Sequence, residues 1–301
     1  MFHDVGNGRG SVKDRAVLFR LVGTESFHRK GAILLKIIAE KINGTRKRVA
    51  QAIKDRDAVF IQDLARRQAE ISATAWLDVN AGTAPQREPE DLIWLVETIQ
   101  AVVDKPLALD SANPAALKAA LGAVRHKPMI NSISLEPGRL DVYPIVAESK
   151  CPAVALAMDE KGIPKTKEER LEVIGKILDK TRPMGIADED LYFDPLAMTI
   201  ATGQENALLF LETVREIKRT FPKVHITCGL SNISFGMPAR SFINRVFLAF
   251  SMEAGLDCAI CDPNNHDIQT TILATNLLLA KDRHCLQFTR AFRAGVFGKS
   301  V

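Results

Sequence analysis

Short hydrophobic runs alternate with longer amphipathic segments along most of the chain. The runs are rich in valine, isoleucine and leucine, as expected for strands buried on both faces of a parallel sheet. The segments between them repeat apolar residues at i, i+3 and i+4, which is typical of helices that cover such a sheet. The predicted strands are Leu34–Ile42, Ala75–Val79, Pro106–Asp110, Pro128–Ser132, Pro152–Met158, Asp190–Pro195, His225–Leu230 and Leu256–Cys261. The predicted helices include Asp57–Ser72, Glu90–Val103, Pro114–Val124, Lys167–Met184, Glu205–Thr220, Arg240–Ala254 and Asp267–Ala280.

Eight successive strand and helix units predict an α/β fold, a single-domain (β/α)8 TIM barrel. The length of 301 residues suits this fold, which typically needs about 250. The competing architecture is a doubly wound open sheet. That sheet requires a glycine-rich phosphate turn after an early strand, and neither GxGxxG nor GxxxxGK[ST] occurs there. The closed barrel is therefore favoured.

The predicted barrel does not use the whole chain. The first 31 residues lack sustained periodicity and carry scattered glycines and charges. Residues 1–33 are therefore predicted to be an N-terminal extension, flexible or non-native, outside the barrel. The barrel is expected to span residues 34–292, and residues 293–301 to form a C-terminal tail.

Composition narrows the classes of function. The chain is 47% hydrophobic and 25% charged, as in soluble globular proteins, and no apolar run approaches the roughly 18 residues of a membrane span. The net charge is +4, and residues 1–30 supply six Lys/Arg against three Asp/Glu, so the remainder is nearly neutral. No basic cluster with interleaved aromatic residues is present, so neither nucleic acid nor a membrane is an expected partner. Five cysteines, an odd number, favour free thiols and a cytoplasmic location.

Polar side chains follow the predicted strands at the end where each strand stops. In an eight-stranded barrel these ends converge on one mouth. Any one such residue could simply cap a helix or form a turn. Together, carboxylates and carboxamides suit a flat heterocycle whose edge alternates N–H, amino and carbonyl groups. The residues are Glu40, Asn43, Asp78, Asn80, Asp110, Ser111, Asn131, Ser132, Asp159, Asp194, Ser231, Asn232 and Asp262.

These motifs resemble those of the pterin-binding methyltransferases that act on methyltetrahydrofolate and corrinoid proteins, relatives of the folate domain of cobalamin-dependent methionine synthase. The resemblance runs from about Leu34 to about Phe292, with one motif at each of six strand ends. The motifs are Glu40-Lys41-Ile42-Asn43-Gly44, Leu77-Asp78-Val79-Asn80, Leu109-Asp110-Ser111, Met129-Ile130-Asn131-Ser132, Asp194-Pro195-Leu196, and Gly229-Leu230-Ser231-Asn232 followed by Pro238-Ala239-Arg240.

The resemblance assigns roles to seven residues. It implies that Asp110, Asn131 and Asp194 hold the polar edge of the pterin. It also implies that Asn232 is the catalytic residue and lies beside N5, the atom that carries the methyl group. Further substrate-binding residues in the same segment would be Gly229, Ser231 and Arg240. For Arg240 an ion pair at the start of its helix is the alternative reading.

The implied enzyme is a methyltransferase that moves a methyl group between N5 of tetrahydrofolate and the cobalt of a corrinoid. Tetrahydrofolate or methyltetrahydrofolate would be its substrate. A corrinoid-binding domain usually shows a DxHxxG segment, which this chain lacks, so cobalamin or another corrinoid is expected on a separate protein. No bound metal is expected in this chain. The resemblance also implies a homodimer.

Three other functions are open at this stage. Dihydropteroate synthase shares the fold. Its sequences are expected to carry a Thr/Ser-rich segment after the first strand and a basic signature near the seventh, whereas this chain has Gly-Leu-Ser-Asn near the seventh strand. A non-catalytic pterin-binding subunit would not need Asn232. Zinc-dependent methyl transfer could use Cys258 and Cys261. Residues three apart on a strand face opposite sides, however, so buried structural cysteines are expected.

Overall fold

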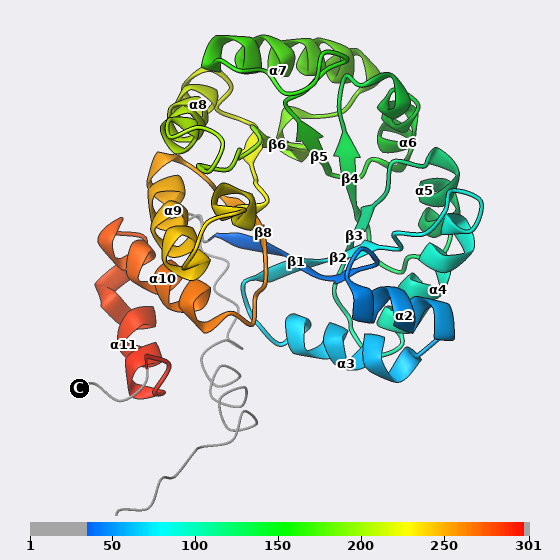
Figure 1. Ribbon diagram of the computed structural model, residues 1–301, viewed down its shortest axis with the longest axis horizontal. Coiled ribbons are helices and arrows are strands. Elements are labelled where there is room, and N and C mark those ends of the chain that lie inside the picture. Colours follow the sequence, from blue (N-terminus) through cyan, green and yellow to red (C-terminus); the bar gives the residue numbers. More distant parts are fainter. Residues whose placement is uncertain (1–34, 298–301) are drawn as a thin grey trace, which may run out of the picture.

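The chain forms a ring of parallel strands surrounded by helices (Figure 1). The computed structural model describes residues 35–297, so the predicted extension over residues 1–33 lies outside the described residues. The strands are β1 (Lys36–Asn43), β2 (Thr74–Asn80), β3 (Leu107–Asp110), β4 (Met129–Ile133), β5 (Ala153–Leu156), β6 (Leu191–Asp194), β7 (His225–Ile226) and β8 (Cys258–Cys261). The helices are α2 (Lys47–Asp55), α3 (Ala58–Ala69), α4 (Glu88–Gln100), α5 (Pro114–Leu121), α6 (Val142–Ser149), α7 (Lys167–Thr181), α8 (Asn206–Thr220), α9 (Arg240–Ala254), α10 (His266–Leu278) and α11 (Leu286–Arg293). Among residues 35–297, no helix is long and apolar enough to cross a membrane.

The sheet closes into a barrel, which confirms the predicted fold class. Each strand pairs in parallel with its neighbours in the order β7-β6-β5-β4-β3-β2-β1-β8. The two ends meet where the backbone N–H of Ile260 donates to the carbonyl of Cys228 at 2.8 Å, and Gly229 forms a parallel bridge with Ile260. Eight parallel strands with helices outside are the (β/α)8 architecture.

The seventh strand is shorter than predicted. The pattern indicated a strand over His225–Leu230, whereas β7 ends at Ile226 and a 3-10 turn, η4 (Leu230–Ser234), begins four residues later. Leu230 is 1% exposed and belongs to the core between sheet and helices. Its apolar character therefore reflects burial in a turn rather than strand pairing.

Strand side chains alternate between two cores. The larger core joins one face of the strands to the helices, whereas a smaller cluster contains strand residues alone and fills the barrel interior. The interior cluster is Ile38, Ala108, Met129, Val154, Tyr192 and Cys258. Cys258 thus faces inward, and Cys261 belongs to the outer core, so the two thiols lie on opposite faces as predicted. Because side chains alternate along a strand, the residue two positions after each interior residue also faces the interior.

A buried carboxylate holds the opposite, N-terminal end of the barrel together. Asp257 is 5% exposed, and its Oδ2 accepts from Lys218 Nζ at 2.8 Å and lies 3.0 Å from His225 Nδ1. Its Oδ1 accepts from the backbone N–H of Ile226 at 2.9 Å. Burial alone would raise the pKa of Asp257, but the hydrogen bonds from His225 and Lys218 outweigh it and the pKa is lowered. The charged form is therefore the one that stabilises the fold.

Replacing Asp257 with asparagine is expected to lower the free energy of unfolding at pH 7 by about 2 kcal/mol, because Lys218 loses its buried counter-charge. Since folding lowers the pKa of Asp257, its contribution is present above the pKa of the unfolded chain and is lost as the pH falls through the folded value. Urea denaturation at pH 7 and pH 3 measures both effects. Asp63→Asn, which breaks only the exposed ion pair with Arg67, is the control and should cost under about 0.5 kcal/mol. An equal cost for the two variants would contradict this account.

Candidate functional site

Polar side chains from several strands gather inside the C-terminal mouth of the barrel. Glu40, Asp110, Asn131 and Asp194 each come two residues after a member of the interior cluster, so all four face the interior. Sheet register places Asp110 opposite Asn131 across β3 and β4. Three of the predicted ring-binding residues, Asp110, Asn131 and Asp194, therefore lie at the C-terminal end of the barrel interior.

A hydrogen bond links β2 to β4 at this mouth, next to the end of β3. The Nδ2 of Asn131 donates to Oδ1 of Asp78 at 3.1 Å, and the side chain of Asn80 faces Asp110. Burial raises the pKa of Asp78 well above its usual range, and repulsion from Asp110 adds to that rise. Burial also raises the pKa of Asp110. The structure thus adds Asp78, to which the resemblance gave no role, to the candidate site.

Asp194 ends β6 almost completely covered, with 6% of its surface exposed. Its Oδ1 accepts from the backbone N–H of Leu196 at 2.7 Å, and the backbone N–H of Gly229 faces the carboxylate. Leu196 adopts a left-handed φ of 65°, a conformation that is costly for a leucine. Burial raises the pKa of Asp194 to about 6. At neutral pH the group is therefore mainly a carboxylate and can accept hydrogen bonds.

Asn232 lies on the turn η4, beside Gly229. Its side chain is exposed, and Gly229 passes so close that an added Cβ would lie 2.9 Å from Asn232 Nδ2. The backbone N–H of the same glycine faces Asp194, so Gly229 lies near both predicted site residues. A glycine at position 229 leaves room for the carboxamide, which is free to meet a ligand at the mouth.

Arg240 fixes the position of this turn. Its Nη2 donates to the carbonyl of Ser231 at 2.7 Å, and its Nε donates to Oγ of Ser234 at 3.0 Å. Burial raises the pKa of Glu40, and the positive charge of Arg240 is one of the smaller effects that oppose this rise. The guanidinium therefore binds the turn that carries Asn232, rather than forming the ion pair considered as the alternative.

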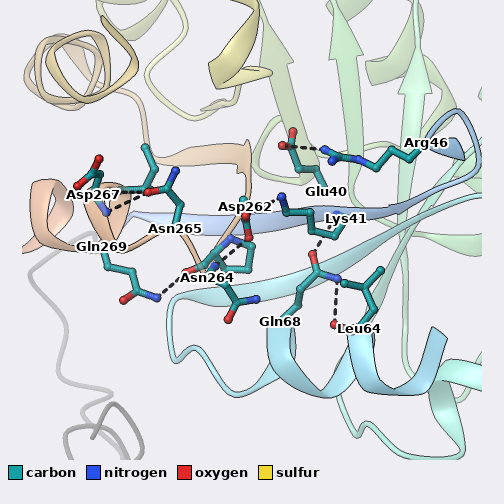
Figure 2. A network of polar contacts seen from close by, with 12 residues as sticks. Glu40, Lys41, Arg46, Leu64, Gln68, Asp262, Asn264, Asn265, Asp267 and Gln269 are labelled. Carbon is teal, nitrogen blue, oxygen red and sulfur yellow. Dashed lines mark hydrogen bonds and ion pairs between the residues drawn. The ribbon is translucent and has the colours of Figure 1, made fainter. Parts of the chain in front are cut away.

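Glu40 and Asn43 organise the first loop. The Oδ1 of Asn43 accepts from the backbone N–H of Thr45 at 2.9 Å and from its Oγ1 at 2.7 Å. Glu40 pairs with Arg46 at 3.3 Å (Figure 2). Gly44 then lies against the β2 loop so closely that an added Cβ would be 1.8 Å from the carbonyl oxygen of Ala81. Only glycine permits this contact, which joins the first two loops of the mouth.

A polar network joins β1 to β8 beside the mouth (Figure 2). Lys41 Nζ pairs with Asp262 at 2.7 Å, and the backbone N–H of Lys41 donates to Oε1 of Gln68 at 3.0 Å. A cavity of about 160 Å³ lies next to this network. It is lined by Glu40, Lys41, Leu230, Ser231, Asn244, Cys261, Asp262, Asn265 and Ile268. Asp110, Asn131 and Asp194 do not line it, so this cavity is a neighbour of the candidate site rather than its centre.

A family model described as pterin binding enzyme matches residues 41–262. The chain belongs to the pterin-binding enzyme family. The match begins near the end of β1 and ends directly after β8, so it covers β2 to β8 and the strand ends that form the mouth.

Relatives within this family differ in size. Methylcorrinoid:tetrahydrofolate methyltransferase of Eubacterium limosum is 38% identical over 265 residues, which cover 87% of this chain and 97% of that protein. Methionine synthase of Mycobacterium tuberculosis is 38% identical over 168 residues, covering 52% of this chain but only 14% of that much longer protein. The similarity to the first relative thus extends over nearly its full length.

Solved structures share the fold at low sequence identity. Dihydropteroate synthase of Xanthomonas albilineans superposes with a TM-score of 0.62 at 17% identity, over 82% of this chain and 91% of that one. The Yersinia pestis synthase gives a TM-score of 0.60 at 15% identity, over 82% and 93% of the two chains. These likenesses concern the barrel alone.

Among residues 35–297 no cluster of three or more His, Cys, Asp or Glu side chains is arranged to hold a metal ion. A more open hollow of about 440 Å³ lies at the N-terminal face, near Arg182 and Lys223. Sites in barrels of this type occupy the C-terminal face, so the candidate site is the mouth built by Asp78, Asp110, Asn131, Asp194 and Asn232.

Proposed function

We propose that the protein is a methyltransferase that moves a methyl group between N5 of tetrahydrofolate and the cobalt of a corrinoid carried by a separate protein. The observation that supports this most directly is the convergence of buried and half-buried carboxylates and half-buried carboxamides on one mouth, which also carries the exposed Asn232. The relative from Eubacterium limosum, a methylcorrinoid:tetrahydrofolate methyltransferase, supports the same activity.

The polar groups at the mouth match the edge of a reduced pterin. The ring presents an amino group and ring N–H groups as donors and a carbonyl oxygen as acceptor. The carboxylates of Asp110 and Asp194 only accept, whereas the carboxamide of Asn131 both donates and accepts. Because one N–H of Asn131 Nδ2 already donates to Asp78, its oxygen and its second N–H are left for the ring. Tetrahydrofolate or methyltetrahydrofolate is thus the proposed substrate.

Asn232 supplies the interaction at N5. When the methyl group leaves, the electron pair of the C–N bond returns to N5, which then takes up a proton; the cobalt of the partner supplies the electron pair for the new bond to carbon. A carboxamide neither gains nor loses a proton near pH 7, so Asn232 donates a hydrogen bond to N5 while solvent or a neighbouring group provides the proton. The same contacts serve the reverse direction, in which N5 receives the methyl group.

Two other functions remain alternatives. A dihydropteroate synthase activity is supported only by the shared fold, at 15–17% sequence identity. A non-catalytic pterin-binding subunit would leave the exposed carboxamide of Asn232 unused. The identity of 38% to a methyltransferase favours methyl transfer over both.

The experiment that tests the proposal combines the protein with tetrahydrofolate and a methylated corrinoid protein and follows the cobalt absorbance. Loss of the methyl-cobalt spectrum that depends on both the protein and tetrahydrofolate is the expected result. One control omits tetrahydrofolate. A separate assay tests whether the protein condenses a dihydropterin pyrophosphate with p-aminobenzoate. Condensation without any demethylation would support the synthase, and binding of tetrahydrofolate without either reaction would support the pterin-binding subunit.

The functional unit is proposed to be a homodimer. Phe242, Val246 and Phe250 lie at i, i+4 and i+8 on α9, and more than half of each side chain is exposed. A self-complementary apolar strip of this kind suits an interface between two identical copies. Phe250→Glu is expected to shift the protein to a monomer in sedimentation velocity. Val59→Glu, at an exposed apolar position on α3, should not; a monomeric wild type would contradict the proposal.

A cytoplasmic location is also proposed. All five cysteines are free, and four of them are buried: Cys151, Cys228, Cys258 and Cys261. Thiols that remain unpaired are typical of a reducing compartment. Fractionation of cells that express the protein tests this location.

A further inference from the structure

A buried hydroxyl joins the turn that carries Asn232 to the helix α9. Ser234, two residues after Asn232, is fully buried. Its Oγ donates to Oδ1 of Asn244 at 2.7 Å, and the Nε of Arg240 donates to this Oγ at 3.0 Å. A serine hydroxyl has a single hydrogen to donate, and its other acceptor, the carbonyl of Ser231, lies farther away at 3.3 Å. The hydroxyl of Ser234 is therefore directed at Asn244.

Asn244 has no role in the proposed reaction. Arg240 and Asn244 are four residues apart on α9, so their side chains lie on one face of the helix, and both reach Ser234. Asn244 is half-buried and also lines the cavity of about 160 Å³ beside the mouth. Without its carboxamide oxygen, the buried hydroxyl would lose its nearest acceptor, and buried polar groups that lose a partner are costly.

The turn is held from a second segment as well. The backbone N–H of Ile200, in the loop after β6, donates to the carbonyl of Ile233 at 3.0 Å, and Arg240 binds the carbonyl of Ser231. Asn232 thus lies between two residues whose carbonyls are each bound by another part of the barrel. Its own carboxamide is exposed, so the direction in which it points depends on the backbone that carries it.

We infer that Ser234 and Asn244 are positioning residues for Asn232, and that the hydrogen bond between them fixes the turn on α9 so that the carboxamide reaches N5 of the bound pterin. The inference rests on the proposed function. Ser234 is fully buried, so it acts on the reaction through the turn and not by touching the substrate. A misplacement of about 1 Å in a catalytic group can cost roughly 10²-fold in rate, so a small shift of this turn is enough to matter.

Single-turnover methyl transfer from a methylated corrinoid protein, at saturating tetrahydrofolate, tests this role. Asn244→Leu, which replaces the acceptor with an apolar side chain of similar size, and Ser234→Ala should each slow transfer about tenfold. The dissociation constant of tetrahydrofolate, measured by calorimetry, should change less than about threefold, because the contacts of the ring are untouched. Asn244→Asp keeps an acceptor for the hydroxyl and should bring the rate to within about threefold of the wild type.

A second background separates positioning from a general loss of structure. In Asn232→Ala, the further change Asn244→Leu or Ser234→Ala should slow transfer less than about twofold, because the group that they position is gone. Ser149→Ala is the matched control. It removes the hydrogen bond of 2.6 Å from Ser149 Oγ to the carbonyl of Ile145, at the end of α6 that leads into β5 and so lies at the opposite end of the barrel. Its rate should equal that of the wild type.

Three results would overturn the inference. They are wild-type rates in Asn244→Leu and Ser234→Ala, equal losses with and without Asn232, and an Asn244→Asp variant no faster than Asn244→Leu. If Ser234→Ala does not fold, as judged by circular dichroism, Asn244→Leu, at the half-buried position, carries the test. A wild type that transfers no methyl group would instead refute the proposed function.

Discussion

Replacing Asn232 with alanine is expected to slow methyl transfer about 10²–10³-fold, the loss typical when one preorganised donor to a developing charge is removed. The dissociation constant of tetrahydrofolate should change less than about threefold. The carboxamide is exposed at the mouth and lies beside Gly229, so its removal leaves the buried contacts of Asp194 intact. The interaction it makes with N5 strengthens only as the methyl group moves, and the loss therefore falls on the rate rather than on binding.

Single-turnover kinetics at saturating tetrahydrofolate, with a methylated corrinoid protein, measures that rate. Asn264→Ala provides a matched control, because Asn264 is an exposed asparagine on the loop between β8 and α10. Its rate should equal that of the wild type. If Asn232→Ala also transferred methyl groups at the wild-type rate, the catalytic assignment would be wrong.

Replacing Asp194 with asparagine is expected to weaken tetrahydrofolate binding about 10–100-fold at pH 8. Hydrogen bonds to a charged acceptor are worth about 1.5–3 kcal/mol, and an amide offers fewer acceptor sites to the donors of the ring. In the wild type, binding should also fall as the pH drops through about 6, where Asp194 becomes protonated. Titration calorimetry on both proteins measures the two effects. Equal affinities at pH 8 would exclude Asp194 from the ring contact.

The same substitution is expected to stabilise the free protein. Folding raises the pKa of Asp194 from 3.8 to about 6, so the contribution of this group is fully favourable below the pKa of the unfolded chain and is lost as the pH rises through the folded value. At pH 8 the charged group therefore opposes folding, and Asp194→Asn should raise the free energy of unfolding by about 1–3 kcal/mol. The gain should largely disappear at pH 4 in chemical denaturation. A carboxylate that lowers the stability of the free protein in this way is typical of a binding site.

The alternation of strand side chains made much of the mouth predictable. Ala108 and Asp110, and likewise Tyr192 and Asp194, are two residues apart, so an interior apolar residue is followed by an interior polar one at the strand end. This spacing of two residues can be read directly from the sequence. The bounds of α9, Arg240–Ala254, could be predicted for a similar reason, since its apolar face repeats along the helix.

Contacts between distant segments could not be predicted in the same way. The sequence predicts Asp78 as a polar residue at a strand end, but its hydrogen bond with Asn131 joins two residues that are 53 positions apart in the chain. Arg170 reads in the sequence as one of many charged residues at a helix start, and only the packing of α7 shows that it is buried. The hydrophobic pattern also predicted no helix over Val142–Ser149, where α6 forms. That short segment includes Pro144, which the first turn of a helix tolerates.

The proposed methyl transfer depends most on one arrangement: a pterin ring held edge-on inside the C-terminal mouth of the barrel. A crystal structure of the protein with methyltetrahydrofolate tests it directly. The ring should contact Asp110, Asn131 and Asp194, and the nitrogen that carries the methyl group should lie within hydrogen-bonding distance of Asn232. A ring bound elsewhere, or one whose methyl-bearing nitrogen points away from Asn232, would contradict the account.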